Sequence, residues 1–160
     1  PELRPSIHQF ILMSSAPEKE VEFVKLREEY GSFFAFHGSP FENFLNIMRN
    51  GLRNASGTNL QLHGAAYGNG IYLAAHSSTS SHYARISTTM WNNSQFDTLS
   101  AMAICEVINK PDQSWEQGNG IWVVPDEICV VTRFLLVRNG AHDLHGITAG
   151  NLTYPTHLFT

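Results

Sequence analysis

The chain has 160 residues, of which 42% are hydrophobic and 15% are charged, and its formal net charge is −4 at pH 7. This composition is typical of one globular domain with a substantial core, and it excludes an intrinsically disordered chain. The lysine and arginine residues are few and scattered, so a global nucleic-acid-binding surface is not supported. No apolar run approaches the ~20 residues that a bilayer-spanning helix needs.

The first predicted helix runs from a capping segment at Ser15 to Tyr30, after an irregular stretch over residues 1–14. Ser15 is predicted to cap it, Pro17 lies in its first turn and Glu18 completes a capping box. Gly31 is predicted to end the helix. The positions predicted to face the core are Val21, Val24 and Leu26.

A strand over residues 33–37 and a second helix are predicted to follow. The strand is the apolar, aromatic run Phe-Phe-Ala-Phe-His. Ser39 and Glu42 form another capping box, with Pro40 in the first turn, and Gly51 is predicted to end the helix. The apolar residues that recur at helical spacing are Phe41, Phe44, Leu45, Ile47 and Met48.

The middle of the chain is predicted to hold one short strand and one helix. Residues 52–66 are predicted to form a loop, and residues 71–73 a short apolar strand. The helix is predicted to begin near Ser77 and to end at about Ile86. Residues 87–98 are polar and rich in turn formers, which indicates an exposed excursion.

The last third is predicted to be mostly strand. Strands are expected over residues 99–108, 121–124 and 128–138, with a loop over residues 110–120. Many short strands with two or three helices favour the α+β class. We therefore expect a single domain over residues 1–160, made of a helical lead-in (1–31), a motif-bearing core (32–138) and a polar tail (139–160).

Two segments carry candidate site chemistry: residues 63–83 and the corner at residues 36–39. In the first, glycines precede a strand and let the backbone approach a flat or phosphorylated ligand, and Tyr72 and Tyr83 can present two rings to one pocket. In the second, His37 at a strand end is followed by a glycine and a hydroxyl. Each residue taken alone is also consistent with a structural role, but the combination favours a small-molecule site.

The order of these motifs resembles the catalytic domain of the poly(ADP-ribose) polymerase superfamily. The motifs are His37-Gly38-Ser39, Asn50-Gly51-Leu52-Arg53, the run YGNGIYLA at 67–74, and then Ser80 and Tyr83. The resemblance covers about residues 33–137, and it is to the diphtheria-toxin-like, His-Tyr-Glu clade and its mono-ADP-ribosyltransferase branch. It implies the ADP-ribosyltransferase fold, in which two packed, mostly antiparallel sheets carry few flanking helices, and it implies NAD as the substrate.

The resemblance also implies a role for each matching residue. His37 would bond a ribose hydroxyl of NAD, and Gly38 would present its backbone N–H and C=O to the nicotinamide carboxamide. Ser80 would bond the carboxamide oxygen, while Tyr72 and Tyr83 would stack on the nicotinamide ring. The residues that would complete the NAD-binding set are Ser39 and Arg53, toward the adenosine and phosphates, and Tyr67 and Gly70 of the glycine-rich run.

The chain departs from the clade at the position of its glutamate, where the register places Ile121. An aliphatic side chain cannot accept a hydrogen bond or activate an incoming ribose hydroxyl, so polymer elongation should be absent. Glu116 and Glu127 are the alternatives for the acidic residue if that register is wrong. The resemblance thus implies an enzyme that transfers a single ADP-ribose to a protein acceptor of unknown identity. A catalytically inactive NAD- or ADP-ribose-binding module is the competing hypothesis, and a degenerate domain that binds nothing is a third.

The remaining polar residues add no metal site. Cys105 and Cys129 fit no ligand spacing and are predicted to be buried thiols of an intracellular protein. The histidine pairs His76 with His82 and His142 with His145 lack a Cys or carboxylate at ligand spacing. Because the chain begins at Pro1 without a methionine, we expect it to be part of a larger multidomain protein. Since it has no long apolar run, we expect no membrane partner.

Overall fold

The protein is an α+β fold in which one antiparallel sheet carries a few short helices. The computed structural model describes residues 7–12, 15–54, 68–85, 87–88, 98–111, 115–118, 120–139 and 149. The helical elements are α1 (Pro17–Tyr30), η1 (Phe41–Asn43), α2 (Phe44–Asn50), α3 (Ser77–Ser81) and η2 (Glu127–Cys129). The strands are β1 (Ile7–Ile11), β2 (Ser32–Gly38), β3 (Ile71–Ala74), β4 (Ser87–Thr88), β5 (Thr98–Ile108), β6 (Trp115–Gln117), β7 (Ile121–Val124) and β8 (Val130–Asn139).

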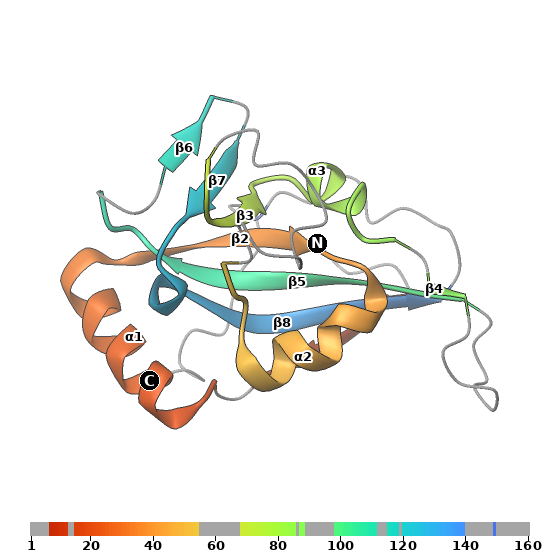
Figure 1. Ribbon diagram of the computed structural model, residues 1–160, viewed down its shortest axis with the longest axis horizontal. Coiled ribbons are helices and arrows are strands. Elements are labelled where there is room, and N and C mark those ends of the chain that lie inside the picture. The colour runs from red at the N-terminus through yellow and green to blue at the C-terminus, as the bar shows by residue number, and fades with distance from the viewer. Residues whose placement is uncertain are drawn as a thin grey trace.

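The sheet runs in the order β1-β8-β5-β2-β3-β7-β6, and β4 pairs with β5 outside this path. The predicted α+β class is confirmed, but the strands form one connected sheet rather than two separate ones. The connection is narrow, because β2 and β3 are paired at Phe36 and Ala74, with no further pair between their described residues. Figure 1 shows β3, β7 and β6 turned away from the long strands β2, β5 and β8.

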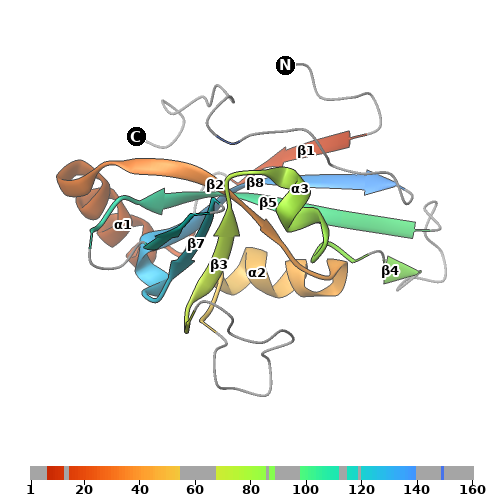
Figure 2. The ribbon, with the colours of Figure 1, turned by 90° about the horizontal axis from the view of Figure 1, so that it is seen from above.

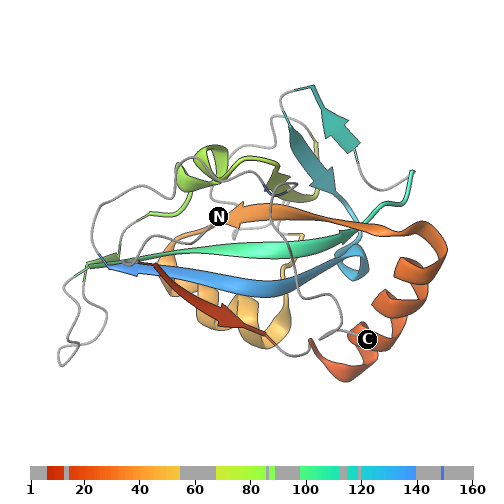
Figure 3. The same ribbon diagram turned by 180° about the vertical axis from the view of Figure 1, so that it is seen from behind.

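Each face of the long strands has its own apolar cluster. One cluster joins Phe23 of α1 and Phe44 and Ile47 of α2 to alternate residues of β5. The other contains Phe36, Met102, Phe134 and, from the C-terminal part of the chain, Ala149. Seen from above, α2 lies on one side of the long strands and β1 on the other (Figure 2), and β1 lies below β8 and in front of α2 when the molecule is seen from behind (Figure 3).

A buried ionic network, which we call the α1 clamp, fixes α1 to the sheet. Arg133 of β8 is fully buried, and its Nε donates to Glu106 Oε2 of β5 at 2.8 Å, while its Nη2 lies 2.7 Å from Glu20 Oε1 of α1. Arg27 of α1 and the Ser32 hydroxyl both reach Glu106 Oε1, at 3.6 and 2.7 Å. Burial raises the pKa of Glu20, but the hydrogen bonds from Arg133 and from the backbone of Ser15 outweigh it and hold that pKa below its usual range.

The predicted inward face of the first helix is correct only in part. Leu26 packs against the core as predicted. The helix also turns Glu20 and Arg27 inward beside the buried Phe23, so charged side chains occupy positions that an apolar pattern assigns to the surface. Val21, predicted to face the core, is 58% exposed. The predicted Ser15 cap was also wrong: Ala16 is the N-cap residue, and Ser15 instead donates its backbone N–H to Glu20 Oε2.

The second and third helices also differ in part from prediction. Gly51 ends α2 as predicted, but Ser39 does not cap it; its hydroxyl instead accepts from Asn43 Nδ2 at 2.9 Å. Phe44 and Ile47 are buried, whereas Leu45 and Met48 lie on the exposed side of this short helix. The third helix, α3, ends at Ser81 rather than near Ile86.

Two predicted irregular segments contain strands. Residues 7–11 form the edge strand β1, which pairs with β8 from Ile11 opposite Phe134 onward. Residues 115–117 form β6, inside the predicted loop at 110–120. Both are edge strands. Strand β1 depends on a partner distant in sequence, and β6 depends on a pairing of three residues, and local residue preferences reveal neither. Strand β7 has its predicted bounds.

Candidate active site

The candidate site lies where β2 and β3 separate beyond the Phe36–Ala74 pair. Continuing that antiparallel register would place Gly38 opposite Tyr72, but the ladder stops before this pair. Instead, the Tyr72 carbonyl oxygen lies 2.9 Å from His37 Nδ1. Since a carbonyl only accepts, Nδ1 carries the hydrogen, and the other ring nitrogen of neutral His37 is left as an acceptor. The imidazole therefore links the two strands at the point where the backbone ladder has stopped.

Gly38 consequently turns its backbone polar groups toward this opening. The Phe36 carbonyl faces α3, since it accepts the Ser80 hydroxyl at 3.0 Å. Backbone groups two residues apart along a strand point to the same side, so the N–H and C=O of Gly38 face the same way. The opening between β2, β3 and α3 thus offers one backbone donor and one backbone acceptor to a flat polar ligand.

Two glycines of the predicted NAD-binding set make close contacts with neighbouring elements. A Cβ on Gly38 would lie 1.9 Å from the Ser80 carbonyl oxygen, so α3 could not approach β2 with any other residue there. A Cβ on Gly70 would lie 2.7 Å from Val123 Cγ1 and 2.9 Å from the Val124 carbonyl group. Gly70 is therefore required by packing against β7, and Gly38 by packing against α3, whatever else each does.

The two tyrosines lie on the elements that border the opening. Tyr72 of β3 is partly buried, and its hydroxyl donates to the Gly68 carbonyl at 2.7 Å, where Gly68 has a φ of +103°. Tyr83 follows α3, with its backbone N–H on the Ser80 carbonyl at 3.1 Å, and its side chain is 44% exposed. The stacking of both rings on one ligand stays a prediction. Ser80, which lies between the two tyrosines in the sequence, is buried, with 4% of its surface exposed.

His37 is electrically neutral at physiological pH in this environment. Burial lowers its pKa from 6.5, and the hydrogen bond to the Tyr72 carbonyl offsets this in part. A neutral ring keeps its second nitrogen as an acceptor, which suits a sugar hydroxyl and not an anion. The electrostatics of the corner therefore agree with the role that the resemblance implies for His37.

The first residue of β7, Ile121, is not acidic, and neither alternative glutamate replaces it. Ile121 pairs with Ala74 and is partly buried. Glu127 lies in η2, beyond the far end of β7, and its Oε1 accepts the backbone N–H of Asn54 at 2.8 Å. Since β7 alone extends about 10 Å, Glu127 is displaced from Ile121 and engaged elsewhere. Glu116 is opposite Trp122 in the β6–β7 register, whereas Gln117 is opposite Ile121.

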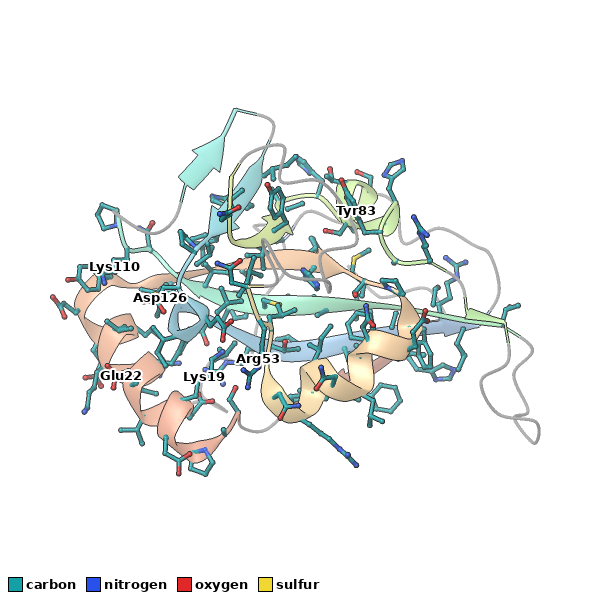
Figure 4. The ribbon with its side chains drawn as sticks, in the orientation of Figure 1. Lys19, Glu22, Arg53, Tyr83, Lys110 and Asp126 are labelled. Atoms are coloured by element: carbon teal, nitrogen blue, oxygen red, sulfur yellow. The ribbon has the colours of Figure 1, made fainter. Side chains whose placement is uncertain are left out.

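Arg53 lies apart from the corner formed by His37 and Gly38. It is exposed and stands beside Lys19, where α1 and α2 approach each other, while Tyr83 lies near α3 on the other side of the long strands (Figure 4). Burial lowers the pKa of Lys19, with Glu127 opposing and Arg53 adding to that effect. Ser39 is buried beside Asn43, and Tyr67 lies outside the described residues. A ligand that reached both His37 and Arg53 would have to be extended, as a dinucleotide is.

The sequence does not reveal the two backbone carbonyls that organise this site, those of Phe36 and Tyr72. Every residue carries such a carbonyl, so no residue type signals its use. Cys105 and Cys129 are buried thiols, as predicted, and burial raises their pKa values to about 12 and about 11. Within the described part of the chain no group of three or more His, Cys, Asp or Glu is placed to hold a metal ion, and none of the helices there is long and apolar enough to cross a membrane. His142 and His145 lie outside the described residues.

The family described as poly(ADP-ribose) polymerase catalytic domain matches this chain over residues 11–120. The chain belongs to that family. The match contains β2, β3 and α3 with the whole corner around His37, and it ends one residue before Ile121. The family resemblance is therefore confirmed, and with it the α+β class. Enzymes of this family use NAD as a substrate.

Relatives in the same family include three curated mammalian proteins. The protein mono-ADP-ribosyltransferase PARP8 of Mus musculus is 42% identical over 156 residues, which cover 81% of this chain and 18% of the relative; PARP8 of Homo sapiens gives the same values. The protein mono-ADP-ribosyltransferase PARP16 of Homo sapiens is 34% identical over 92 residues, covering 57% of this chain and 27% of the relative. The chain thus spans less than a fifth of the length of PARP8.

Proposed function

We propose that this chain is an NAD-dependent mono-ADP-ribosyltransferase, which moves one ADP-ribose from NAD to a protein acceptor and releases nicotinamide. The observation that carries the proposal is the corner where the β2–β3 ladder stops: there His37 Nδ1 donates to the Tyr72 carbonyl instead of a backbone pair, directly beside Gly38. The PARP8 relatives are named protein mono-ADP-ribosyltransferases, which supports the proposal.

In this proposal the corner holds the nicotinamide end of NAD. The Gly38 N–H donates to the carboxamide oxygen, and its C=O accepts from the carboxamide nitrogen. The Ser80 hydroxyl hydrogen is already donated to Phe36, so the Ser80 oxygen would accept from the carboxamide nitrogen rather than donate to its oxygen. The ring nitrogen of His37 that does not face Tyr72 accepts a ribose hydroxyl. These contacts fix the nicotinamide and its ribose in one relative orientation.

The reaction then depends on stabilising a positive charge on the ribose. As the bond between ribose and nicotinamide breaks, an oxocarbenium-like sugar develops, and a site that fixes both fragments lowers the barrier without having to reorganise. Ile121 cannot accept a hydrogen bond from the ribose hydroxyl that would otherwise be extended into a chain. The proposal is therefore for transfer of a single unit.

The test is incubation of the chain with labelled NAD and candidate acceptor proteins, followed by intact-mass measurement. Single additions of ADP-ribose with release of nicotinamide are expected, and Tyr72→Ala should abolish them. Transfer that persists unchanged in Tyr72→Ala would reject this site.

The aliphatic residue at Ile121 favours a second candidate, an NAD-binding module without catalysis. Calorimetry distinguishes the two. Heat of NAD binding with no nicotinamide released over time would support the binding module and would contradict the transferase.

A further inference from the structure

Transfer to some acceptors releases a proton that the residues described so far do not take up. This inference rests on the proposed function. A hydroxyl or thiol acceptor must lose its hydrogen when it bonds to the ribose, whereas a carboxylate acceptor has none to lose. Ile121 has no basic atom, and His37 is engaged with the Tyr72 carbonyl and with the ribose in the proposed pose.

His76 is the titratable side chain that the structure brings to the start of β7. A Cβ placed on Gly120, the residue before Ile121, would have the side-chain atoms of Ala75 and His76 as its nearest contacts. The distances are 3.3 Å to Ala75 Cβ, 3.8 Å to His76 Cδ2 and 4.0 Å to His76 Nε2. The Ala75 N–H also donates to the Gly120 carbonyl at 2.8 Å, which fixes this contact between the end of β3 and the start of β7.

His76 stands at the start of α3. It is the N-cap residue of that helix, with an extended backbone (φ −110°, ψ 131°). The imidazole is exposed, so an incoming side chain can reach it. In the chain it stands four residues after Tyr72 and four before Ser80, between two residues that border the site.

We propose that His76 is the general base for transfer to an acceptor that arrives with a proton on its nucleophilic atom, a Ser, Thr or Cys side chain. The bond from C1 of the ribose to the nicotinamide nitrogen breaks, and its electron pair leaves with nicotinamide, which becomes neutral. The acceptor oxygen or sulfur bonds to C1, and its proton passes to the imidazole of His76 and then to water.

The test compares two acceptor peptides that differ at one position, Ser in one and Glu in the other. The chain, its His76→Gln variant and a matched control, His82→Gln, are each incubated with NAD and either peptide. His82 is an exposed histidine at the other end of α3. Thermal unfolding of each variant establishes that it is folded.

The expected result is a loss confined to one variant and one peptide. His76→Gln should slow transfer to the Ser peptide by roughly 10²–10⁴-fold, with the KM for NAD and transfer to the Glu peptide unchanged. His82→Gln should match the unsubstituted chain on both peptides. Adding Ile121→Glu to His76→Gln should restore transfer to the Ser peptide, because the new carboxylate stands at the same strand start.

The other outcomes overturn the inference in distinguishable ways. An equal loss on both peptides would indicate a structural role for His76, and no loss on the Ser peptide would exclude a base there. An unsubstituted chain that modifies the Glu peptide alone would reject the role of His76 and leave the proposed function standing. A chain that modifies neither peptide and releases no nicotinamide would reject both.

Discussion

The site depends on the absence of a side chain at Gly38. Gly38→Ala would place a Cβ within 1.9 Å of the Ser80 carbonyl, which belongs to backbone and cannot rotate away. Helix α3 must therefore move from β2, and we expect the free energy of unfolding to fall by about 1–3 kcal/mol. Nicotinamide binding, measured by calorimetry, should be lost because Ser80 of α3 no longer lies against Gly38 of β2.

The control for this substitution is Gly118→Ala. Gly118 is exposed, and a Cβ there would meet no atom within 4 Å. The free energy of unfolding and the nicotinamide affinity should therefore stay unchanged. If Gly38→Ala kept its stability and its nicotinamide affinity, the contact between β2 and α3 would not be what the site requires.

The lowered pKa of His37 makes part of the stability dependent on pH. The charged ring is disfavoured in the folded protein, so the unfolded chain binds more protons as the pH falls below 6.5. The contribution of His37 is therefore present above pH 6.5 and is lost as the pH falls through the lower folded value. His37→Asn should remove this component from a series of denaturant unfolding curves between pH 8 and 5.

A direct measurement of His37 is its NMR titration. Its ring signals should change at a lower pH than the 6.5 of an unperturbed histidine. A midpoint at or above that value would contradict the desolvation of the His37 ring, because the hydrogen bond to the Tyr72 carbonyl acts in the opposite direction and raises the pKa.

Among the elements, α1 is held by the α1 clamp as well as by apolar contact. Glu106 is 2% exposed and Arg133 is fully buried, so removing the charge of Glu106 leaves the buried Arg133 with only one of its two carboxylate partners in the α1 clamp, Glu20. Glu106→Gln should lower the free energy of unfolding by about 3–5 kcal/mol, the range for breaking a buried ion pair. Hydrogen exchange should show the loss of protection concentrated in α1, which reaches Glu106 through Arg27 and Arg133 through Glu20.

Two variants separate the α1 clamp from general effects of charge. Glu22→Gln removes an exposed carboxylate from the same helix (Figure 4), and its effect should stay within about 0.5 kcal/mol. The double substitution Glu106→Met with Arg133→Met removes both buried charges, so it should cost less than Glu106→Gln alone. A larger cost for the double variant would show that packing, not charge, dominates at this position.

The elements that the sequence predicts well are those whose signals are local. Gly31 and Gly51 end their helices because their φ values of +72° and +76° suit glycine, and β7 is a short apolar run stopped by Pro125. The charged residues on the inward face of α1 were not predictable from an apolar pattern, since Glu20 and Arg27 acquire their role only through Glu106 and Arg133, which are far along the chain.

The site divides in the same way. The order of His37, Gly38, Tyr72 and Ser80 is visible in the sequence and indicates a family. What that order cannot show is why the corner is open. The Tyr72 carbonyl bonds an imidazole instead of Gly38, and the Ser80 carbonyl excludes a Cβ at Gly38; both facts involve backbone atoms and pairs distant in sequence.

At the scale of the whole molecule, the candidate site lies at the narrow joint of the sheet. The long strands β2, β5 and β8 form one part and β3, β7 and β6 the other, joined in the described ladder at Phe36–Ala74. The contacts of His37 with Tyr72 and of Ser80 with Phe36 supplement that joint. A ligand bound there bridges both parts and should stabilise the domain as a whole.

Nicotinamide tests this expectation, because in the proposed pose it would fill the corner without reacting. At about 100 times its Kd it should raise the free energy of unfolding by about 2.7 kcal/mol, and the unfolding temperature by several degrees. Nicotinic acid is the matched ligand: it has the same ring, but its carboxylate cannot donate to the Gly38 carbonyl, so the shift should be absent or much smaller at equal concentration. Tyr72→Ala should lose the nicotinamide shift as well. Equal shifts from the two ligands would mean that the carboxamide is not read by Gly38, and the ligand would then have to be placed outside the joint between β2 and β3.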